Sequence, residues 1–167
     1  MSVVSCQLSV AQSSWTCQTG QTGRTGRLRS AAIRFLLPGR MKKSMNIHTM
    51  QVGIIGTDCY VVWDKAKEAL VIDPGDDANK ILKFLESRKL SVAAYLLTHG
   101  HVDHISGLAD MYDKAPAPIA IHPDDLAWAF EKSSRIFPFP VPRRPERIER
   151  MLADGQKWTD GGMSYKV

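Results

Sequence analysis

Three histidines and an aspartate lie within six residues of the segment THGHVDH, residues 98–104. Imidazole nitrogen and carboxylate oxygen are donors that Zn²⁺ and iron accept in proteins. In an HxHxDH segment, His99 and His101 can face one metal ion while Asp103 and His104 face a neighbouring ion. Gly100 has no Cβ atom, so the backbone of the loop can adopt dihedral angles that other residues disfavour. The segment therefore predicts a centre of one or two metal ions.

The residues before this segment predict the elements that position it. Strand-like runs at 51–56, 59–64 and 69–73 are separated by turn residues and indicate a β-meander. A helical pattern follows, with Asp76 or Asp77 as its N-cap. The nearly continuous apolar run 92–98 is typical of a strand covered on both faces. The histidines follow at the carboxyl end of that strand, where open α/β sheets bind ligands.

The residues after this segment predict further alternation of helix and strand. We expect a helix over 104–112, a short strand over 118–122, a helix over 123–133 that begins with a proline, a proline-rich loop over 137–145 and a strand over 163–167. Helices that alternate with strands after a meander indicate a mixed α/β layer fold. The last strand reaches the final residue without a turn, so we expect the chain to hold part of a domain.

Residues 1–40 differ in composition from the rest of the chain. They are rich in Ser, Thr, Gln and Gly and contain five Arg but no Asp or Glu. This composition predicts a disordered leader. The leader is either an organelle transit peptide or translated sequence upstream of a true start at Met41 or Met45. The second interpretation is favoured because no amphipathic helix is evident, and the folded part is then 41–167.

The net charge of +5 arises from this leader, because residues 41–167 carry 17 basic and 17 acidic side chains. A neutral body argues against a nucleic-acid partner. No run approaches the roughly 18 apolar residues of a membrane span, and three scattered cysteines do not make a disulfide framework. We expect a cytoplasmic protein that acts on a small molecule, or an organellar one if residues 1–40 are a transit peptide.

The segment THGHVDHISG resembles the first metal-binding motif of the metallo-β-lactamase fold superfamily. The runs TDCYVVWD at 57–64 and VIDPG at 71–75 are similar to the strands that precede this motif in glyoxalase II-like members, the hydroxyacylglutathione hydrolase-like enzymes. The resemblance covers about residues 50–167 and implies an αββα sandwich, of which this chain holds about the first half. Asp58 is a departure, because many relatives carry Asn there.

The resemblance implies a role for each candidate residue. His99 and His101 correspond to ligands of metal 1, Asp103 and His104 to ligands of metal 2, and Asp73 to an acidic group that supports the site. The ions are Zn²⁺, with iron as an alternative. The implied activity is hydrolysis of a thioester, lactone or similar acyl substrate by a metal-bound hydroxide. Asp103 would also orient the attacking water as a catalytic residue.

The family's remaining ligands are a third His in a Gly-His-Thr-Pro-Gly-like motif, a bridging Asp and a last His, and none is recognised in this sequence. The run DGGMSYKV at 160–167 is similar to the strand that leads into the third His. The chain is therefore expected to be truncated and inactive by itself. Two alternatives stay open: an iron-dependent persulfide dioxygenase or diiron redox protein on the same fold, and a non-catalytic fragment.

Other chemically able residues have simpler interpretations. Two histidines, His48 and His122, lie outside the segment 98–104. His122 is predicted to be a packed or hydrogen-bonded strand-end residue. Cys59 lies in an apolar strand and is predicted to be a buried hydrophobe, not a nucleophile. Taken without the resemblance, Asp73 is equally a turn-forming cap or a partner of the metal site.

Overall fold

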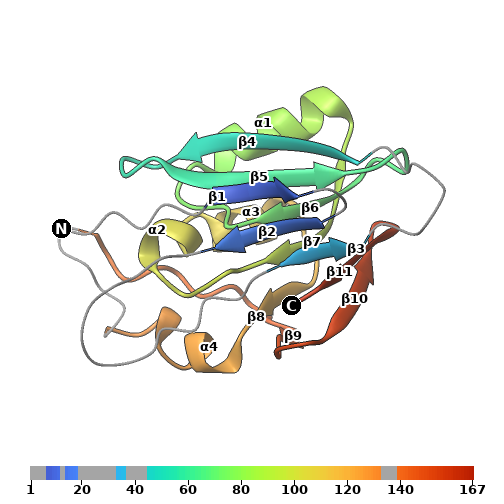
Figure 1. The fold of residues 1–167 in the computed structure, drawn as a ribbon. Helices are drawn as coiled ribbons and strands as arrows, with labels where there is room; N and C mark the ends of the chain where they lie inside the picture. Colours follow the sequence, from blue (N-terminus) through green and yellow to red (C-terminus); the bar gives the residue numbers. More distant parts are fainter. Residues whose placement is uncertain (1–6, 12–13, 19–32, 37–44, 133–138) are drawn as a thin grey trace.

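The computed structural model describes residues 7–11, 14–18, 33–36, 45–132 and 139–167, and Figure 1 shows helices layered on sheet. Its largest sheet has the order β4-β5-β6-β7-β8-β9. The first three strands are antiparallel and form the predicted meander, whereas β6 to β9 are parallel. The bounds are β4 (Asn46–Val52), β5 (Thr57–Trp63), β6 (Glu68–Ile72), β7 (Ser91–Leu96), β8 (Ile119–Ile121) and β9 (Arg150–Met151).

A second, antiparallel sheet has the order β10-β11-β3, and β1 and β2 pair with each other. Gly161 and Gly162 connect β10 to β11 with φ values of 54° and 72°. Two consecutive residues with positive φ are what a tight hairpin turn of the matching twist requires. The bounds are β1 (Gln7–Ala11), β2 (Ser14–Gln18), β3 (Arg34–Leu36), β10 (Lys157–Asp160) and β11 (Met163–Lys166).

The large sheet is buried on both faces, which explains the apolar runs in its strands. Successive residues point to opposite faces of a strand, and here they enter two different cores. The core on the helical side includes Val61, Val71, Tyr95, Ile81, Leu108 and Met111. The core toward the second sheet includes Val62, Leu70, Leu96, Phe35, Met163 and Tyr165. The predicted mixed α/β layer fold is confirmed.

The helices are α1 (Ala78–Arg88), α2 (Val102–Ile105), α3 (Leu108–Lys114) and α4 (Pro123–Ala129). The single helix expected over 104–112 is thus two helices. They are separated at Gly107, whose N–H donates to the Gly75 carbonyl oxygen. A Cβ atom on Gly107 would lie 2.8 Å from that oxygen, so the chain needs a glycine where the two segments meet. Among the described residues, no helix is long and apolar enough to cross a bilayer.

Two other element bounds and the capping contact of Asp77 also differ from expectation. The first meander strand ends at Val52 and not at residue 56, because Gly53 and Gly56 adopt φ values of 68° and 77° and form a turn. Asp77 holds the N-cap position of α1, but its carboxylate accepts the N–H of Gly53 and not one from the helix. The helix expected over 123–133 ends at Ala129. Of the proline-rich loop, 139–145 is irregular and 137–138 lies outside the described residues.

The expectation of a disordered leader is wrong at residues 33–36. Ile33 and Phe35 are 3% and 2% exposed, and the Phe35 ring lies 6.1 Å from that of Tyr165 on the paired strand β11. Ile33 and Phe35 share one face of the strand and Arg34 is exposed on the other, so the segment is a short amphipathic strand. The average composition of residues 1–40 hides this pattern. The strands β1 and β2 also fall in the leader. Residues 1–6, 12–13, 19–32 and 37–40 lie outside the described residues, and the transit-peptide and start-site interpretations stay predictions.

If β3 belongs to the core, Phe35→Ala should lower the free energy of unfolding by about 3–5 kcal/mol, because it deletes a buried aromatic ring. Arg34→Ala, which removes an exposed neighbouring side chain, should change it by less than about 0.5 kcal/mol. Urea denaturation followed by circular dichroism measures both values. Equal midpoints for the two variants would show that β3 does not contribute to the core.

Candidate metal centre

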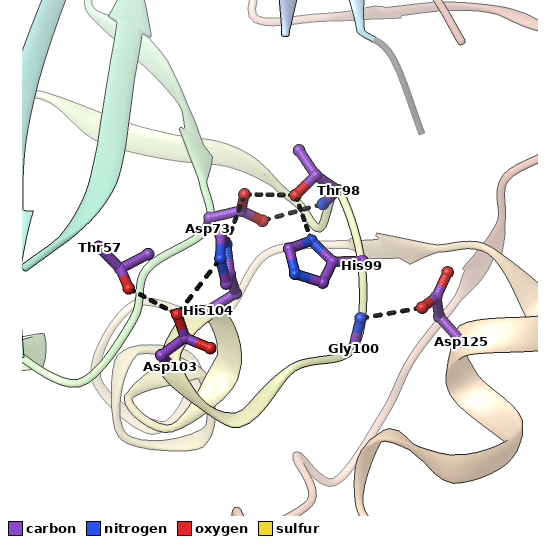
Figure 2. Close-up of polar contacts among 8 residues, drawn as sticks. All are labelled: Thr57, Asp73, Thr98, His99, Gly100, Asp103, His104 and Asp125. Carbon is purple, nitrogen blue, oxygen red and sulfur yellow. Dashed lines mark hydrogen bonds and ion pairs between the residues drawn. The ribbon is translucent and has the colours of Figure 1, made fainter. Parts of the chain in front are cut away.

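The candidate ligands follow the carboxyl end of β7, and Figure 2 shows three of them, His99, Asp103 and His104. His99 and His101 belong to the loop that follows the strand, whereas Asp103 and His104 belong to the short helix α2. His99 is 4% exposed and His104 is 1% exposed. His104 is helical, as the helix expected from residue 104 implies, and two of the three imidazoles are buried.

The structure brings these four side chains together. The His99 ring centroid lies 4.6 Å from that of His101 and 4.0 Å from that of His104. His104 Nε2 lies 3.5 Å from Asp103 Oδ2. The donor atoms of His99, His104 and Asp73 all lie within 4.8 Å of one another, close enough to face a common ion. The site thus combines imidazole and carboxylate donors in one buried cluster.

Asp73 joins the ends of β6 and β7. It is fully buried, and its φ of 49° places it in the left-handed region directly after β6. Its Oδ1 accepts the Thr98 N–H at 2.9 Å, and its Oδ2 accepts the Thr98 hydroxyl at 2.5 Å. The same Oδ2 lies 3.0 Å from His104 Nδ1. Asp73 therefore contacts Thr98, two residues past the end of β7, and one of the candidate ligands. This arrangement favours the interpretation of a supporting partner over that of a simple turn cap.

Thr98 determines which nitrogen of His99 carries the proton. A hydroxyl has one proton to donate, and Thr98 donates it to Asp73. Thr98 Oγ1 must then accept from His99 Nδ1, which lies 3.0 Å away. His99 Nε2 is left with its lone pair, and this buried atom has no hydrogen-bond partner among the described residues. An unsatisfied buried acceptor is unfavourable by about 1–3 kcal/mol, and a metal ion would satisfy it.

Burial and charge divide the imidazoles into two kinds. Burial lowers the pKa of His99 to about 4 and also lowers the pKa of His101, so both rings are neutral near pH 7. Burial acts in the same direction on His104, but the Asp73 carboxylate outweighs it and raises the His104 pKa. Burial would raise the pKa of Asp73, yet its contact with His104 holds it below the usual range. Neutral imidazoles with free lone pairs are the form that binds metals, and an ion bound at His104 must displace a proton.

Two further residues support the site and were not predicted from the sequence. The Thr57 hydroxyl donates to Asp103 Oδ2 at 2.8 Å from a position 46 residues earlier. The Gly100 N–H donates to Asp125 Oδ1 at 3.0 Å across 25 residues. No local pattern links residues so far apart. Thr98 could have been found, because a hydroxyl residue directly preceding the first ligand is able to bond that ligand's Nδ1.

The spare histidines and Cys59 make other contacts. His48 on β4 stacks on Phe84, with ring centroids 4.0 Å apart. His122 precedes α4 and its Nδ1 accepts the Asp124 N–H, so the prediction of a hydrogen-bonded strand-end residue is confirmed. Cys59 is a free, fully buried thiol whose pKa is raised by burial, as expected of a packed hydrophobe.

Comparison with known proteins identifies the family of this fold and site. Residues 52–162 match the family model of the Metallo-beta-lactamase superfamily. The chain belongs to this superfamily. This metallo-β-lactamase superfamily member is 39% identical over 61 residues to the hydroxyacylglutathione hydrolase GloC of Haemophilus influenzae, covering 36% of this chain and 29% of GloC. It is 29% identical over 132 residues to an uncharacterized protein of Mycobacterium tuberculosis, covering 74% and 59%.

Solved structures of other proteins agree with the fold described above. The crystal structure of the BLEG-1 B3 metallo-beta-lactamase aligns with a TM-score of 0.65 and 28% identity, over 72% of this chain and 59% of that one. The structure of TTHA1623 in a di-iron-bound form aligns with a TM-score of 0.52 and 27% identity, over 66% and 56%. The present superfamily member thus spans about three-fifths or less of the length of the proteins that it matches. The predicted resemblance to glyoxalase II-like members is confirmed.

The low pKa of His99 predicts a pH-dependent stability of this superfamily member when a chelator keeps it free of metal. The unfolded chain protonates His99 near pH 6.5, whereas the folded chain does so near 4. The unfolded state therefore binds more protons between these values, so stability is lost as the pH falls from 6.5 to 4, by about 3 kcal/mol.

His99→Asn isolates this contribution, because an amide does not titrate and can still donate to Thr98. Urea unfolding of both proteins at pH 7 and at pH 4.5 measures it. The wild type should lose more stability than His99→Asn on acidification, and an identical loss in the two proteins would contradict the assignment of a neutral His99.

Proposed function

We propose that this chain carries the metal-binding loop of a metal-dependent hydrolase that acts on a small acyl substrate, such as a thioester or a lactone. The observation that carries the proposal is the lone pair of His99 Nε2, which is buried beside His104 and receives a hydrogen bond from no described residue. A polar atom left in this state is uncommon in a folded protein and calls for a ligand. The similarity to a hydroxyacylglutathione hydrolase supports a thioester as the substrate class.

The donor set fits two neighbouring ions. His99 and His101 would hold one ion, and Asp103 and His104 would hold the other. A bound divalent ion lowers the pKa of its water to near 7 and polarises the substrate carbonyl. Zinc suits these nitrogen and oxygen donors.

The chain's own residues would orient the donors and the attacking water. Thr98 presents His99 Nε2 by fixing the opposite nitrogen. Asp73 faces His104 Nδ1 and thereby leaves Nε2 directed toward Asp103. Asp103, held by the Thr57 hydroxyl through Oδ2, has a second carboxylate oxygen with which to accept a proton from the attacking water.

An iron-dependent redox enzyme is a second candidate. One specific observation favours it, namely the di-iron-bound form of TTHA1623 at 27% identity. Imidazole and carboxylate donors suit iron as well as zinc. Metal analysis of the purified protein separates the two candidates, because the redox candidate requires iron whereas the hydrolase is active with zinc alone.

Metal binding is the first test. The metal-free chain, titrated with Zn²⁺ in competition with a chromophoric chelator, should bind zinc. His99→Ala removes the imidazole nitrogen Nε2 as a metal ligand, and Asp103→Ala removes a carboxylate ligand. Each variant should therefore weaken zinc binding at least about tenfold. His48→Ala is the matched control, since His48 stacks on Phe84 in β4 and should leave zinc affinity unchanged. Wild-type affinity in both site variants would refute the assigned donor set.

Hydrolysis is the second test. Catalytic zinc sites normally have three protein ligands, whereas two are predicted here for each ion. We therefore expect at most a residual rate of hydrolysis of thioester and lactone substrates. Any zinc-dependent rate should fall to the uncatalysed background in Asp103→Ala, while His48→Ala retains it. A zinc-dependent rate that survives in Asp103→Ala would exclude Asp103 from the reaction.

A further inference from the structure

Helix α4 contacts the loop that separates the first two candidate ligands. The Asp125 carboxylate is 5% exposed and accepts the Gly100 N–H at 3.0 Å, as Figure 2 shows. Gly100 lies between His99 and His101, so this hydrogen bond holds the peptide that joins the two imidazoles. A buried carboxylate is unfavourable unless it is hydrogen-bonded, and the described residues give Asp125 this one hydrogen bond to its side chain.

Two independent contacts bring the same helix against the same loop. A Cβ atom on Gly100 would lie 2.8 Å from the Cβ of Ala129, so the loop packs directly on the helix and has no room for a side chain there. Gly100 is therefore required for space, whereas the sequence suggested conformational freedom. The Trp128 ring centroid lies 5.5 Å from that of His101, with an interplanar angle of 62°. Hydrogen bond, backbone packing and ring contact all meet at residues 100 and 101.

We propose that Asp125 is a positioning residue that, with α4, sets the orientation of His101 relative to His99. His99 is held by a different contact, from Thr98, whose partner Asp73 follows β6. The two rings lie at 88° to each other, each fixed by a different element. The role rests on the proposed function, because the orientation of this pair matters only if it binds an ion.

Removing the carboxylate should therefore weaken metal binding without removing a ligand. Asp125→Ala frees the Gly100 N–H and should lower zinc affinity about 10–100-fold, as the loss of an outer-shell partner does. Asp125→Asn retains an oxygen acceptor of the same size and should restore affinity to within a few-fold of the wild type. Asp124→Ala is the matched control, because it removes the same charge from the adjacent position, where the side chain is 82% exposed.

Hydrogen exchange of the Gly100 amide in the metal-free protein provides a readout that does not depend on activity. The amide should exchange slowly in the wild type, in Asp125→Asn and in Asp124→Ala, and faster in Asp125→Ala. If Asp125→Ala does not fold, Gly100→Ala replaces it, because the new methyl group would press the loop away from Ala129. Gly100→Ala should weaken zinc binding, and adding Ala129→Gly should restore part of the affinity.

The outcomes separate this inference from the proposed function. A wild-type chain that binds no zinc would overturn the proposed function and the inference together. If the wild type binds zinc and either Asp125→Ala or Gly100→Ala binds it with the affinity of the wild type, the inference alone is overturned. Equal weakening by Asp125→Ala and Asp125→Asn would also overturn it, because charge and not the hydrogen bond would then be responsible.

Discussion

The buried bridge between Asp73 and Thr98 is the interaction on which the site depends. A fully buried carboxylate is tolerated in a folded protein only when its charge and lone pairs are satisfied. Here Thr98, just past the end of the adjacent strand β7, donates both its N–H and its hydroxyl. The same bridge settles the tautomer of His99 and faces His104. Losing it would disturb two imidazoles and the pairing of the strand ends at once.

Glycine packing keeps the segments around this bridge close together. A Cβ atom on Gly75 would lie 2.2 Å from a methyl group of Val52 on β4, and the Gly75 N–H donates to the His104 carbonyl at 2.9 Å. Gly75 also accepts from Gly107 at the start of α3. The turn after β6 thus holds the edge of the meander, the ligand-bearing helix and the following helix in contact. The backbone under the candidate ligands is therefore packed on several sides, which favours a fixed orientation of their side chains.

The features that the sequence predicts well are those that depend on neighbours in the chain. The HxHxDH spacing and the apolar runs of β5, β6 and β7 are local patterns, and burial of the sheet on both faces makes those runs nearly continuous. Most of the unpredicted features at the site and in the core join distant residues. Thr57 and Asp125 reach the site only through tertiary packing, β3 is recognisable as a strand only through its pairing with β11, and Gly107 interrupts a helical pattern because of a contact with Gly75.

The support of the histidine loop by α4 has a consequence for the order in which the protein is made. A ribosome releases the chain from its amino end, so His99 and His101 emerge before Ala129 and the rest of the helix that packs on them. During that interval Thr98 and Asp73 can already contact the histidine loop, whereas α4 cannot. The loop therefore gains its packing against Ala129 only after the nascent chain has extended through α4.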